Sequence, residues 1–375
     1  MWLLKQKNKT ISILLVIILS IPILFPLWQK GFFSSDDGEW MIIRFSAFHQ
    51  TLADGQFPVR FLARLNHEYG YPVANFLYPG FMYLAEIPKI LGFGFVDSIK
   101  IILGLSIVGS AIFTYLWLRK IFTNLAALVG ALFYLHTPYH LFDLYKRGSV
   151  GEILALAVVP FILWSIEQRS FFWTSLGIAM LILSHNTLAL LLLPIVIVYM
   201  FLRNVLSIKH QVLSIIFGLA LSAFFWLPAI FDLQYTRFSQ TPVSDWQNYF
   251  VEFSLIGWGT LIIFITFFIK YFRFNDLNHF SKLALMFFSA GVGSIFLSLS
   301  YSSFFWQILP VGFIQFPFRF LSITILSAAF LSAFVIDGFS KKKKLIASIM
   351  LLTALLVSAI PYLKPTVFFD KGEGF

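Results

Sequence analysis

Apolar segments long enough to cross a lipid bilayer recur along this sequence, and they constrain its fold more than any other feature. A helix needs about 20 apolar residues to span the hydrocarbon core of a membrane. The sequence therefore predicts an all-α polytopic membrane protein with about eleven transmembrane helices, folded as a single membrane domain over residues 1–375. The candidate spans are roughly 10–28, 98–118, 121–138, 150–166, 170–185, 187–203, 210–230, 253–271, 282–300, 318–337 and 345–362.

Composition supports the same class of protein. Hydrophobic residues make up 59% of the chain and charged residues 12%, whereas soluble domains average about 25% charged residues. The absence of cysteine excludes disulfides and thiolate metal sites. A lysine-rich and then apolar N-terminus is typical of a signal sequence, but residues 26–30 offer no small-residue cleavage site, so we expect an uncleaved anchor.

The charged residues predict how the chain is oriented in a cell membrane. Lys5, Lys7 and Lys9 precede the first span and predict a cytoplasmic N-terminus. Alternating the spans from there puts more than half of the 27 basic residues on the inner face and most of the acids outside. This asymmetry accounts for the net charge of +10 without a nucleic-acid partner. The inner basic residues outside the N-terminus are Arg119, Lys120, Arg169, Arg203, Lys209, Lys270, Arg273, Lys282 and Lys341 to Lys344.

Residues 73–92 determine the number of spans. Tyr78, Pro79 and Gly80 break this apolar segment, and a full span here would invert every later loop. We therefore expect it to lie in or dip into the outer interface. Residues 31–97 then form a first extracytoplasmic loop with two or three interfacial helices.

Under this topology the unusual polar groups fall on one face, which predicts an outward cavity at the bilayer surface. They come from separate segments: Asp36, Asp37 and Glu39; Lys146, Arg147 and Glu152; His185 and Asn186; Gln315 and Arg319; and the end of the seventh span at Trp226.

Two of these segments have a structural alternative at a helix start. The acids at 36–39 could cap a helix, or at least one of them could be a functional carboxylate. Ser149 and Glu152 have capping-box spacing, so Glu152 could satisfy backbone donors. The same helix start, beside Lys146 and Arg147, could instead bind an anion such as a lipid phosphate.

The two later segments have alternatives as well. His185 and Asn186 could form a buried corner whose hydrogen bonds are satisfied, or they could contact a ligand. Arg319 lies in an aromatic run at the entrance of a span, where a guanidinium is costly without a phosphate or carboxylate partner. This favours a functional role for Arg319.

Several motifs resemble the bacterial membrane family labelled 6-pyruvoyl-tetrahydropterin synthase-related, over residues of about 30 to 335. After the acidic loop they are Ala53-Asp54-Gly55-Gln56-Phe57-Pro58-Val59-Arg60, Gly70-Tyr71-Pro72, Phe76-Leu77-Tyr78-Pro79, Arg147-Gly148-x-x-Gly151-Glu152, Ser184-His185-Asn186 and Gln315-Phe316-Pro317-Phe318-Arg319. The layout is similar to that of the GT-C superfamily, which includes protein mannosyltransferases, aminoarabinose transferase and YfhO-type proteins. Asp36 stands where we expect a histidine in relatives. Relatives often continue beyond the last spans, so we expect the C-terminus of this chain to be truncated.

The resemblance implies a membrane glycosyltransferase that passes a sugar from a polyprenyl-phosphate donor to a lipid, glycan or protein acceptor on the outer face. It implies Asp37 as the base, with Asp36 and Glu39 beside it in the catalytic loop. The residues implied for phosphate or substrate binding are Lys146, Arg147, Glu152, His185, Asn186, Gln315 and Arg319. If a divalent cation such as Mg²⁺ or Mn²⁺ takes part, the clustered carboxylates Asp36, Asp37 and Glu39 are its expected ligands.

Two other functions use the same fold. A lipid-linked saccharide transporter or flippase would use the charged cavity without making bonds, and polar residues along the spans down to the inner face would favour it. A non-catalytic cell-envelope assembly protein would keep the fold but lose the chemistry. The sequence shows few polar residues toward the inner face.

Overall fold

The computed structural model describes residues 2–236, 245–274, 281–308, 312–365 and 367–372. The side chains of Lys5, Lys7 and Arg273, together with the whole of Asp276 and residues 373–375, lie outside the described part. The distribution of charges across the membrane stays a prediction.

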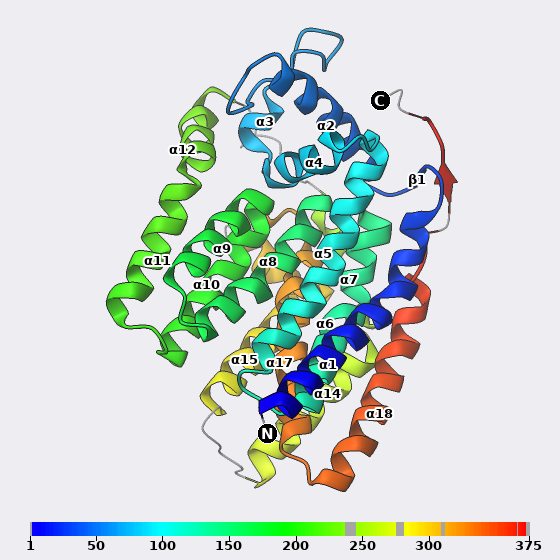
Figure 1. The fold of residues 1–375 in the computed structure, drawn as a ribbon, viewed down its shortest axis with the longest axis vertical. Coiled ribbons are helices and arrows are strands. Elements are labelled where there is room, and N and C mark those ends of the chain that lie inside the picture. Colours follow the sequence, from blue (N-terminus) through cyan, green and yellow to red (C-terminus); the bar gives the residue numbers. More distant parts are fainter. Residues whose placement is uncertain (1, 237–244, 275–280, 309–311, 366, 373–375) are drawn as a thin grey trace.

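The chain is helical almost throughout (Figure 1). Its first half contains α1 (Trp2–Leu24), η1 (Phe25–Trp28), β1 (Phe32–Phe33), α2 (Gly38–Ala53), α3 (Val73–Phe76), α4 (Gly80–Ile90), α5 (Phe95–Leu118), α6 (Asn124–His136), α7 (Pro138–Phe142), η2 (Asp143–Arg147), α8 (Val150–Glu167) and α9 (Phe171–Ser184). The middle contains α10 (Asn186–Arg203), α11 (Ile208–Leu221), α12 (Ala223–Asp232), η3 (Leu233–Tyr235), η5 (Trp246–Tyr249), α13 (Phe253–Ile256) and α14 (Trp258–Phe274). The remainder contains α15 (Ser281–Ser298), η6 (Ser300–Ser302), α16 (Ser303–Ile308), η7 (Gly312–Ile314), η8 (Pro317–Phe320), α17 (Leu321–Asp337), α18 (Lys341–Ala359), η9 (Ile360–Tyr362) and β2 (Phe368–Phe369).

Length and composition confirm a polytopic helical membrane protein. Within the described residues, 7 helices are long and apolar enough to cross a membrane, and 9 if two bent helix pairs each count as one span. Two shorter apolar helices, Phe171–Ser184 and Trp258–Tyr271, lie at two further predicted span positions. The total of about eleven spans stays a prediction.

The centre of the bundle is built from α8 and α17, whose side chains are buried almost all round. α5 packs against α8, and α6 packs against α17. Gly130 on α6 permits the second contact, because a Cβ there would lie 2.7 Å from the backbone oxygen of Ala329. Small residues of this kind let transmembrane helices approach closely.

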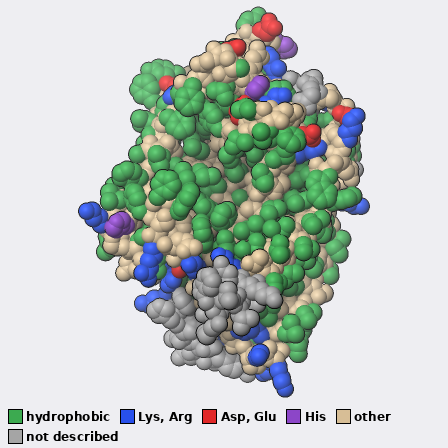
Figure 2. Space-filling model, viewed as in Figure 1, with side chains coloured by type: hydrophobic (Ala, Val, Ile, Leu, Met, Phe, Trp, Pro, Cys, Tyr) green, Lys and Arg blue, Asp and Glu red, His purple; other side chains and the backbone are tan. Residues whose placement is uncertain are grey.

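The helices at the periphery expose apolar side chains (Figure 2). On α18, for example, Ile346 and Met350 are exposed, and on α11 so is Ile216. An apolar surface of this extent is unstable in water and fits contact with lipid.

Helices α2, α3 and α4 gather at one end of the bundle (Figure 1), between the end of η1 and the start of α5. This arrangement confirms short helices in the predicted first loop. The C-terminal segment reaches the same end, where Phe32 and Phe33 pair antiparallel with Phe369 and Phe368. This two-residue ladder is an addition to the predicted all-α fold.

Two predicted spans are bent rather than straight. The helix predicted at 121–138 ends at His136, and the chain continues at an angle of 42° through Pro138–Arg147. Thr137 is extended there, as expected for a residue that precedes proline. The helix predicted at 210–230 bends by 65° between α11 and α12. The first of these bends determines where Arg147 lies.

Candidate active site

The fully buried Glu152, in the first turn of α8, is the centre of a polar cluster at the end of the bundle that carries α2 to α4. Arg319 Nε donates a hydrogen bond of 2.9 Å to Glu152 Oε1, and the hydroxyl of Tyr139 lies 3.4 Å from Oε2. His185 Nε2 and Arg147 Nη2 lie 3.5 and 3.7 Å from Oε1. Side chains from three separate segments, Pro138–Arg147, the corner at His185 and η8, therefore converge on one carboxylate.

This position of Glu152 decides between the two functions considered for it. Ser149 occupies the N-cap position of α8 but makes no side-chain capping bond, and its hydroxyl oxygen has no hydrogen-bond partner among the described residues. The capping-box interpretation of Ser149 and Glu152 is therefore wrong. The Glu152 carboxylate instead accepts a hydrogen bond from Arg319 and lies close to Arg147.

Arg319 lies in η8 and is buried. Its Nη1 donates to the backbone oxygen of Ile314 at 2.9 Å and to Gln315 Oε1 at 2.7 Å, and its guanidinium stacks over the ring of Phe316. Gln315 has a φ of 68°, a left-handed conformation that is uncommon for residues other than glycine. The structure thus brings Gln315, Arg319 and Glu152 together, and much of the hydrogen-bonding capacity of Arg319 is used within the protein.

Arg147 joins the acidic loop to the buried Glu152. Its Nη2 donates to Asp37 Oδ2 at 2.7 Å, and its Nη1 lies 3.9 Å from Asp36 Oδ2. The two backbones also pair, because the amide of Asp36 donates to the oxygen of Lys146 at 3.0 Å and that of Asp37 to the oxygen of Arg147 at 2.8 Å. Arg147 is buried and the two carboxylates are partly exposed, so this contact joins the surface loop to the buried cluster.

Gly148 permits this close approach of the two segments. Its φ is 62°, and a Cβ at this position would lie 2.3 Å from Ser35 Oγ. Gly151, in the first turn of α8, is equally restricted, since its Cβ would lie 2.0 Å from Cε2 of Tyr78. The glycines of the Arg147-Gly148-x-x-Gly151-Glu152 motif are therefore required for packing around the cluster.

Asp37 occupies the N-cap position of α2, but its carboxylate does not cap the helix. The side chain of Ser35 takes that role, because its Oγ accepts from the amide of Gly38 at 3.2 Å. Burial raises the pKa of the Asp37 carboxyl, and the neighbouring Arg147 guanidinium opposes that rise without cancelling it. The Asp37 carboxylate thus pairs with Arg147 and does not cap the helix, which favours the functional alternative for this loop.

The other two acids of the loop have their own basic partners. Asp36 Oδ1 lies 3.3 Å from Lys146 Nζ, and Glu39 contacts Lys371 Nζ. Within the described residues, no group of three His, Asp or Glu side chains has the geometry of a metal site. The residues present therefore do not fit a divalent cation held by Asp36, Asp37 and Glu39, and no step of the chemistry below uses one.

His185 lies at the corner between α9 and α10. Its Nδ1 accepts from the amide of Leu188 at 3.2 Å, which leaves the proton on Nε2, the nitrogen that faces Glu152. Burial lowers the pKa of His185 to about 3, so the ring is neutral and faces Glu152 without forming an ion pair. The ring also packs on Tyr78, with centroids 4.4 Å apart. The Nδ1 of His185 is therefore hydrogen-bonded within the corner, whereas its Nε2 faces the cluster.

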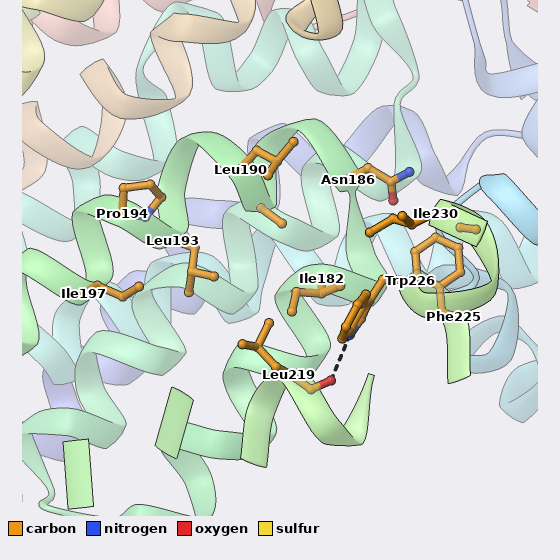
Figure 3. A pocket seen from close by; sticks show the side chains of 12 residues that line it. Ile182, Asn186, Leu190, Leu193, Pro194, Ile197, Leu219, Phe225, Trp226 and Ile230 are labelled. Atoms are coloured by element: carbon orange, nitrogen blue, oxygen red, sulfur yellow. Dashed lines mark hydrogen bonds between the residues drawn. The ribbon is translucent and has the colours of Figure 1, made fainter. Parts of the chain in front are cut away.

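Asn186 points away from the cluster. Its Nδ2 donates to the backbone oxygen of Phe76 at 2.9 Å, and its side chain lines an apolar groove of about 410 Å³. Figure 3 shows the groove between α9, α10, α11 and α12, with Asn186 near one end, Ile197 toward the other and Trp226 beside it. The eleven steps from residue 186 to residue 197 correspond to about 16 Å along α10. The groove therefore leads from the polar cluster along the outside of the bundle.

Three residues of the cluster were not among the predicted site residues: Tyr78, Tyr139 and Asp143. Tyr78 lies in the motif Phe76-Leu77-Tyr78-Pro79, and this motif was the feature of the sequence that could have identified it. Asp143 is fully buried, and neither of its carboxylate oxygens has a hydrogen-bond partner in the described structure. Tyr139 and Asp143 belong to the bent continuation of α6, which the sequence placed in a loop.

Residues 78–366 match the family described as 6-pyruvoyl-tetrahydropterin synthase related domain, a membrane protein family. The chain belongs to this family. The match includes every cluster residue named above except Asp36, Asp37 and Glu39, which precede it. No curated protein matches the sequence.

Solved structures with a similar fold include an arabinofuranosyltransferase and an oligosaccharyltransferase. Arabinofuranosyltransferase AftD from Mycobacteria has a TM-score of 0.56 at 13% identity, over 96% of this chain and 27% of its own. The apo oligosaccharyltransferase from Archaeoglobus fulgidus has a TM-score of 0.53 at 13% identity, over 98% of this chain and 56% of its own. ArnT from Cupriavidus metallidurans, solved with undecaprenyl phosphate, scores 0.49 at 14% identity, over 93% of this chain and 63% of its own. The chain thus shares the fold of the first two proteins, and it spans less than two thirds of the length of each of the three.

Proposed function

We propose that this protein is a membrane glycosyltransferase that moves a sugar from a polyprenyl-phosphate donor to an acceptor at the extracytoplasmic surface. The observation that carries the proposal is the ion pair between Asp37 and Arg147, which places a partly exposed carboxylate beside a buried guanidinium at the mouth of the cluster. A carboxylate can take a proton, and a guanidinium can hold a phosphate. Sugar transfer from a phosphate needs both in the same place.

In the proposed reaction the acceptor hydroxyl attacks the anomeric carbon of the donor sugar. A bond forms between the acceptor oxygen and that carbon, and the bond from the carbon to the phosphate oxygen breaks. Asp37 takes the hydroxyl proton, and the polyprenyl phosphate leaves with the bonding electron pair. Arg147, with Lys146 at the surface and Arg319 below, stabilises the phosphate charge as it develops.

Glu152 and His185 have a positioning role in this account. Glu152 balances the charges of Arg147 and Arg319, and it holds Arg319 through the 2.9 Å bond to Nε. Neutral His185 fixes the carboxylate from the side of α10. Gln315 holds the far side of the Arg319 guanidinium. With these contacts the two arginines stay in place before a donor arrives.

The apolar groove between α10 and α12 supports a lipid-linked donor. It starts beside His185, at Asn186, and its lining is almost entirely apolar. A prenyl chain lying there would leave its phosphate near the cluster. The fold neighbour ArnT was solved with undecaprenyl phosphate, which is a ligand of this chemical class.

The distribution of charges favours transfer over transport. At the opposite end of α8 and α10, Glu167 and Arg203 form a closed pair, with nitrogen–oxygen distances of 2.6 and 2.7 Å. Glu167 also accepts a hydrogen bond from the hydroxyl of Tyr199 at this end of the bundle. A transporter would need polar groups that connect the two ends, whereas a transferase needs one site.

A transfer assay tests the proposal. The purified full chain in lipid nanodiscs is incubated with radiolabelled polyprenyl-phosphate sugars and a membrane-lipid extract. We expect label to leave the donor for an acceptor while free polyprenyl phosphate appears. A donor that crosses the bilayer of proteoliposomes with its sugar still attached would contradict transfer and support the transporter alternative.

A further inference from the structure

A second pocket lies on the outer side of α2, away from the apolar groove. Its volume is about 320 Å³, in the size range of small-ligand sites. It is lined by Trp40, Ile43, Arg44, Leu65, Asn66 and Tyr71. The proposed chemistry uses none of these residues.

The pocket adjoins the proposed site through α2 itself. Trp40 and Arg44 follow Asp37 by three and seven residues, the spacing of one helix face. With a rise of about 1.5 Å per residue they lie about 4.5 and 10.5 Å beyond Asp37 along the helix. Burial raises the pKa of the Tyr78 phenol, and the charge of Arg44 acts on that pKa in the opposite direction. Arg44 is therefore close enough to influence Tyr78, the residue that packs on His185.

Arg44 contributes a positive charge to the pocket wall. Its side chain is half-buried, and in the described ranges it forms no ion pair. Its Nη1 lies 4.0 Å from the sulfur of Met41, which is a weak acceptor. A half-buried guanidinium without a carboxylate partner matches a ligand that brings its own negative charge.

The remaining walls present flat rings and an amide. Trp40 is 59% exposed and Tyr71 is 37% exposed. Tyr71 is fixed by backbone hydrogen bonds of 2.9 and 3.1 Å to Leu62. Such rings offer a large apolar face, and each has a polar edge group that can bond to a hydroxyl.

The turn that carries Asn66 is strained. Asn66, His67 and Glu68 have φ values of 57°, 55° and 67°, three successive left-handed residues, none of them glycine. The turn is closed by a bond of 2.9 Å from the amide of Gly70 to the oxygen of Leu65. Strain of this kind persists where the surrounding structure enforces it, and it is concentrated at ligand sites.

From these features we infer that the pocket binds a saccharide unit that carries a carboxylate or phosphate group, as part of the acceptor. Sugars combine apolar C–H faces with hydroxyl edges, which match the rings of Trp40 and Tyr71 and the amide of Asn66. The acidic group pairs with Arg44. This inference rests on the proposed function, since it assigns the acceptor class for the base at Asp37, which is on the same helix.

A binding experiment that does not depend on transfer tests the pocket. The full chain in nanodiscs is applied to immobilised saccharides in four arms: neutral, uronic-acid and phosphate-substituted sugars, and glycerol phosphate as a headgroup without sugar. We expect the acidic sugars to bind more tightly than their neutral counterparts and than glycerol phosphate. Trp40→Ala and Arg44→Gln should each weaken that binding by roughly tenfold or more, because the first removes the ring that packs on the sugar and the second removes the charge that pairs with its acidic group. Trp28→Ala and Arg169→Gln, at exposed residues outside the pocket, are the matched controls.

The results also separate this inference from the proposed function. Asp37→Asn should bind the acidic sugars as the wild type does, because Asp37 does not line the pocket. If the wild type binds acidic sugars but transfers no sugar, the pocket assignment stands and the proposed transferase function is overturned. Transfer with an unchanged acceptor KM in both Trp40→Ala and Arg44→Gln would overturn the pocket assignment alone. Equal binding of neutral and acidic sugars, or binding of glycerol phosphate as tight as that of any sugar, would also overturn it.

Discussion

Arg147 Nη2 lies 2.7 Å from Asp37 Oδ2, and the same nitrogen is 3.7 Å from Glu152 Oε1, although 110 residues separate Arg147 from Asp37. A single guanidinium therefore links the partly exposed carboxylate of Asp37 to the buried carboxylate of Glu152. The proposed proton acceptor and the proposed phosphate site are thus parts of one network. A substitution at one of these two sites should therefore alter the function of the other.

Arg147→Lys should lower sugar transfer by roughly tenfold or more, because lysine cannot reproduce the bidentate geometry of a guanidinium. The loss should appear as weaker use of polyprenyl-phosphate donors, with normal expression. Arg203→Lys is the control, because Arg203 forms a similar arginine–glutamate pair with Glu167 at the other end of the bundle. Initial rates at several donor concentrations measure the effect. Equal rates for both variants and the wild type would remove Arg147 from the phosphate site.

Glu152→Gln should destabilise the fold by about 3–5 kcal/mol, because it leaves two buried guanidinium groups without their shared counter-charge. Adding Arg319→Met to this variant should restore part of the loss, since one of the unpaired cations is then gone. Thermal unfolding in detergent, followed by tryptophan fluorescence, gives the comparison. A melting temperature for Glu152→Gln equal to that of the wild type would mean that Glu152 does not hold the cluster together.

Gly148→Ala and Gly151→Ala should both reduce activity, because the added methyl groups would overlap Ser35 and Tyr78. Gly148→Ala also forces a residue with a Cβ into a left-handed φ. Gly109→Ala in α5 is the matched control, since its Cβ would have no atom within 4 Å, and alanine in place of a helical glycine stabilises by about 0.5–1 kcal/mol. Stability and transfer should be measured for all three. Full activity of Gly151→Ala would show that the contact between α8 and Tyr78 is not needed.

Labelling of single introduced cysteines tests the orientation of the protein in the membrane. It gives no background from the protein itself, because the sequence contains no cysteine. A cysteine at Lys146 should react with an impermeant maleimide added to intact cells, whereas one at Lys120 should react only after the membrane is opened. Both predictions follow from the distribution of basic residues. Labelling of the Lys120 position from outside would reverse the topology and place the cluster in the cytoplasm.

The sequence alone predicted the fold class and much of the cluster, because both depend on strong local signals. Apolar length identifies spans, and charged residues between spans are few enough that each one is informative. The structure brings together Asp37, Arg147, Glu152, His185 and Arg319, all of them predicted site residues. It does not bring Glu39 to them, because Lys371, from the far end of the chain, pairs with Glu39.

The features that the sequence could not provide depend on contacts between distant segments. The bend at Thr137 turns an expected loop into helix and buries Tyr139 and Asp143 in the cluster. The ladder between β1 and β2 consists of only two residues in each strand, which is too short to give a periodic pattern. Capping-box spacing at Ser149 and Glu152 was misleading, because a buried arginine binds a carboxylate more strongly than backbone amides do.

The most direct test of the central claim is the pH dependence of sugar transfer by the wild type and Asp37→Asn. If Asp37 is the base, wild-type transfer should fall as the pH is lowered through the pKa of Asp37, which burial places above the ordinary value of about 3.9. Asp37→Asn should lose about 10²–10⁴-fold in rate and show no such limb, while Asp36→Asn should be milder. Near-normal transfer by Asp37→Asn would contradict the account. So would large losses in both variants together with inhibition by chelators, which would assign these two acids to a metal instead.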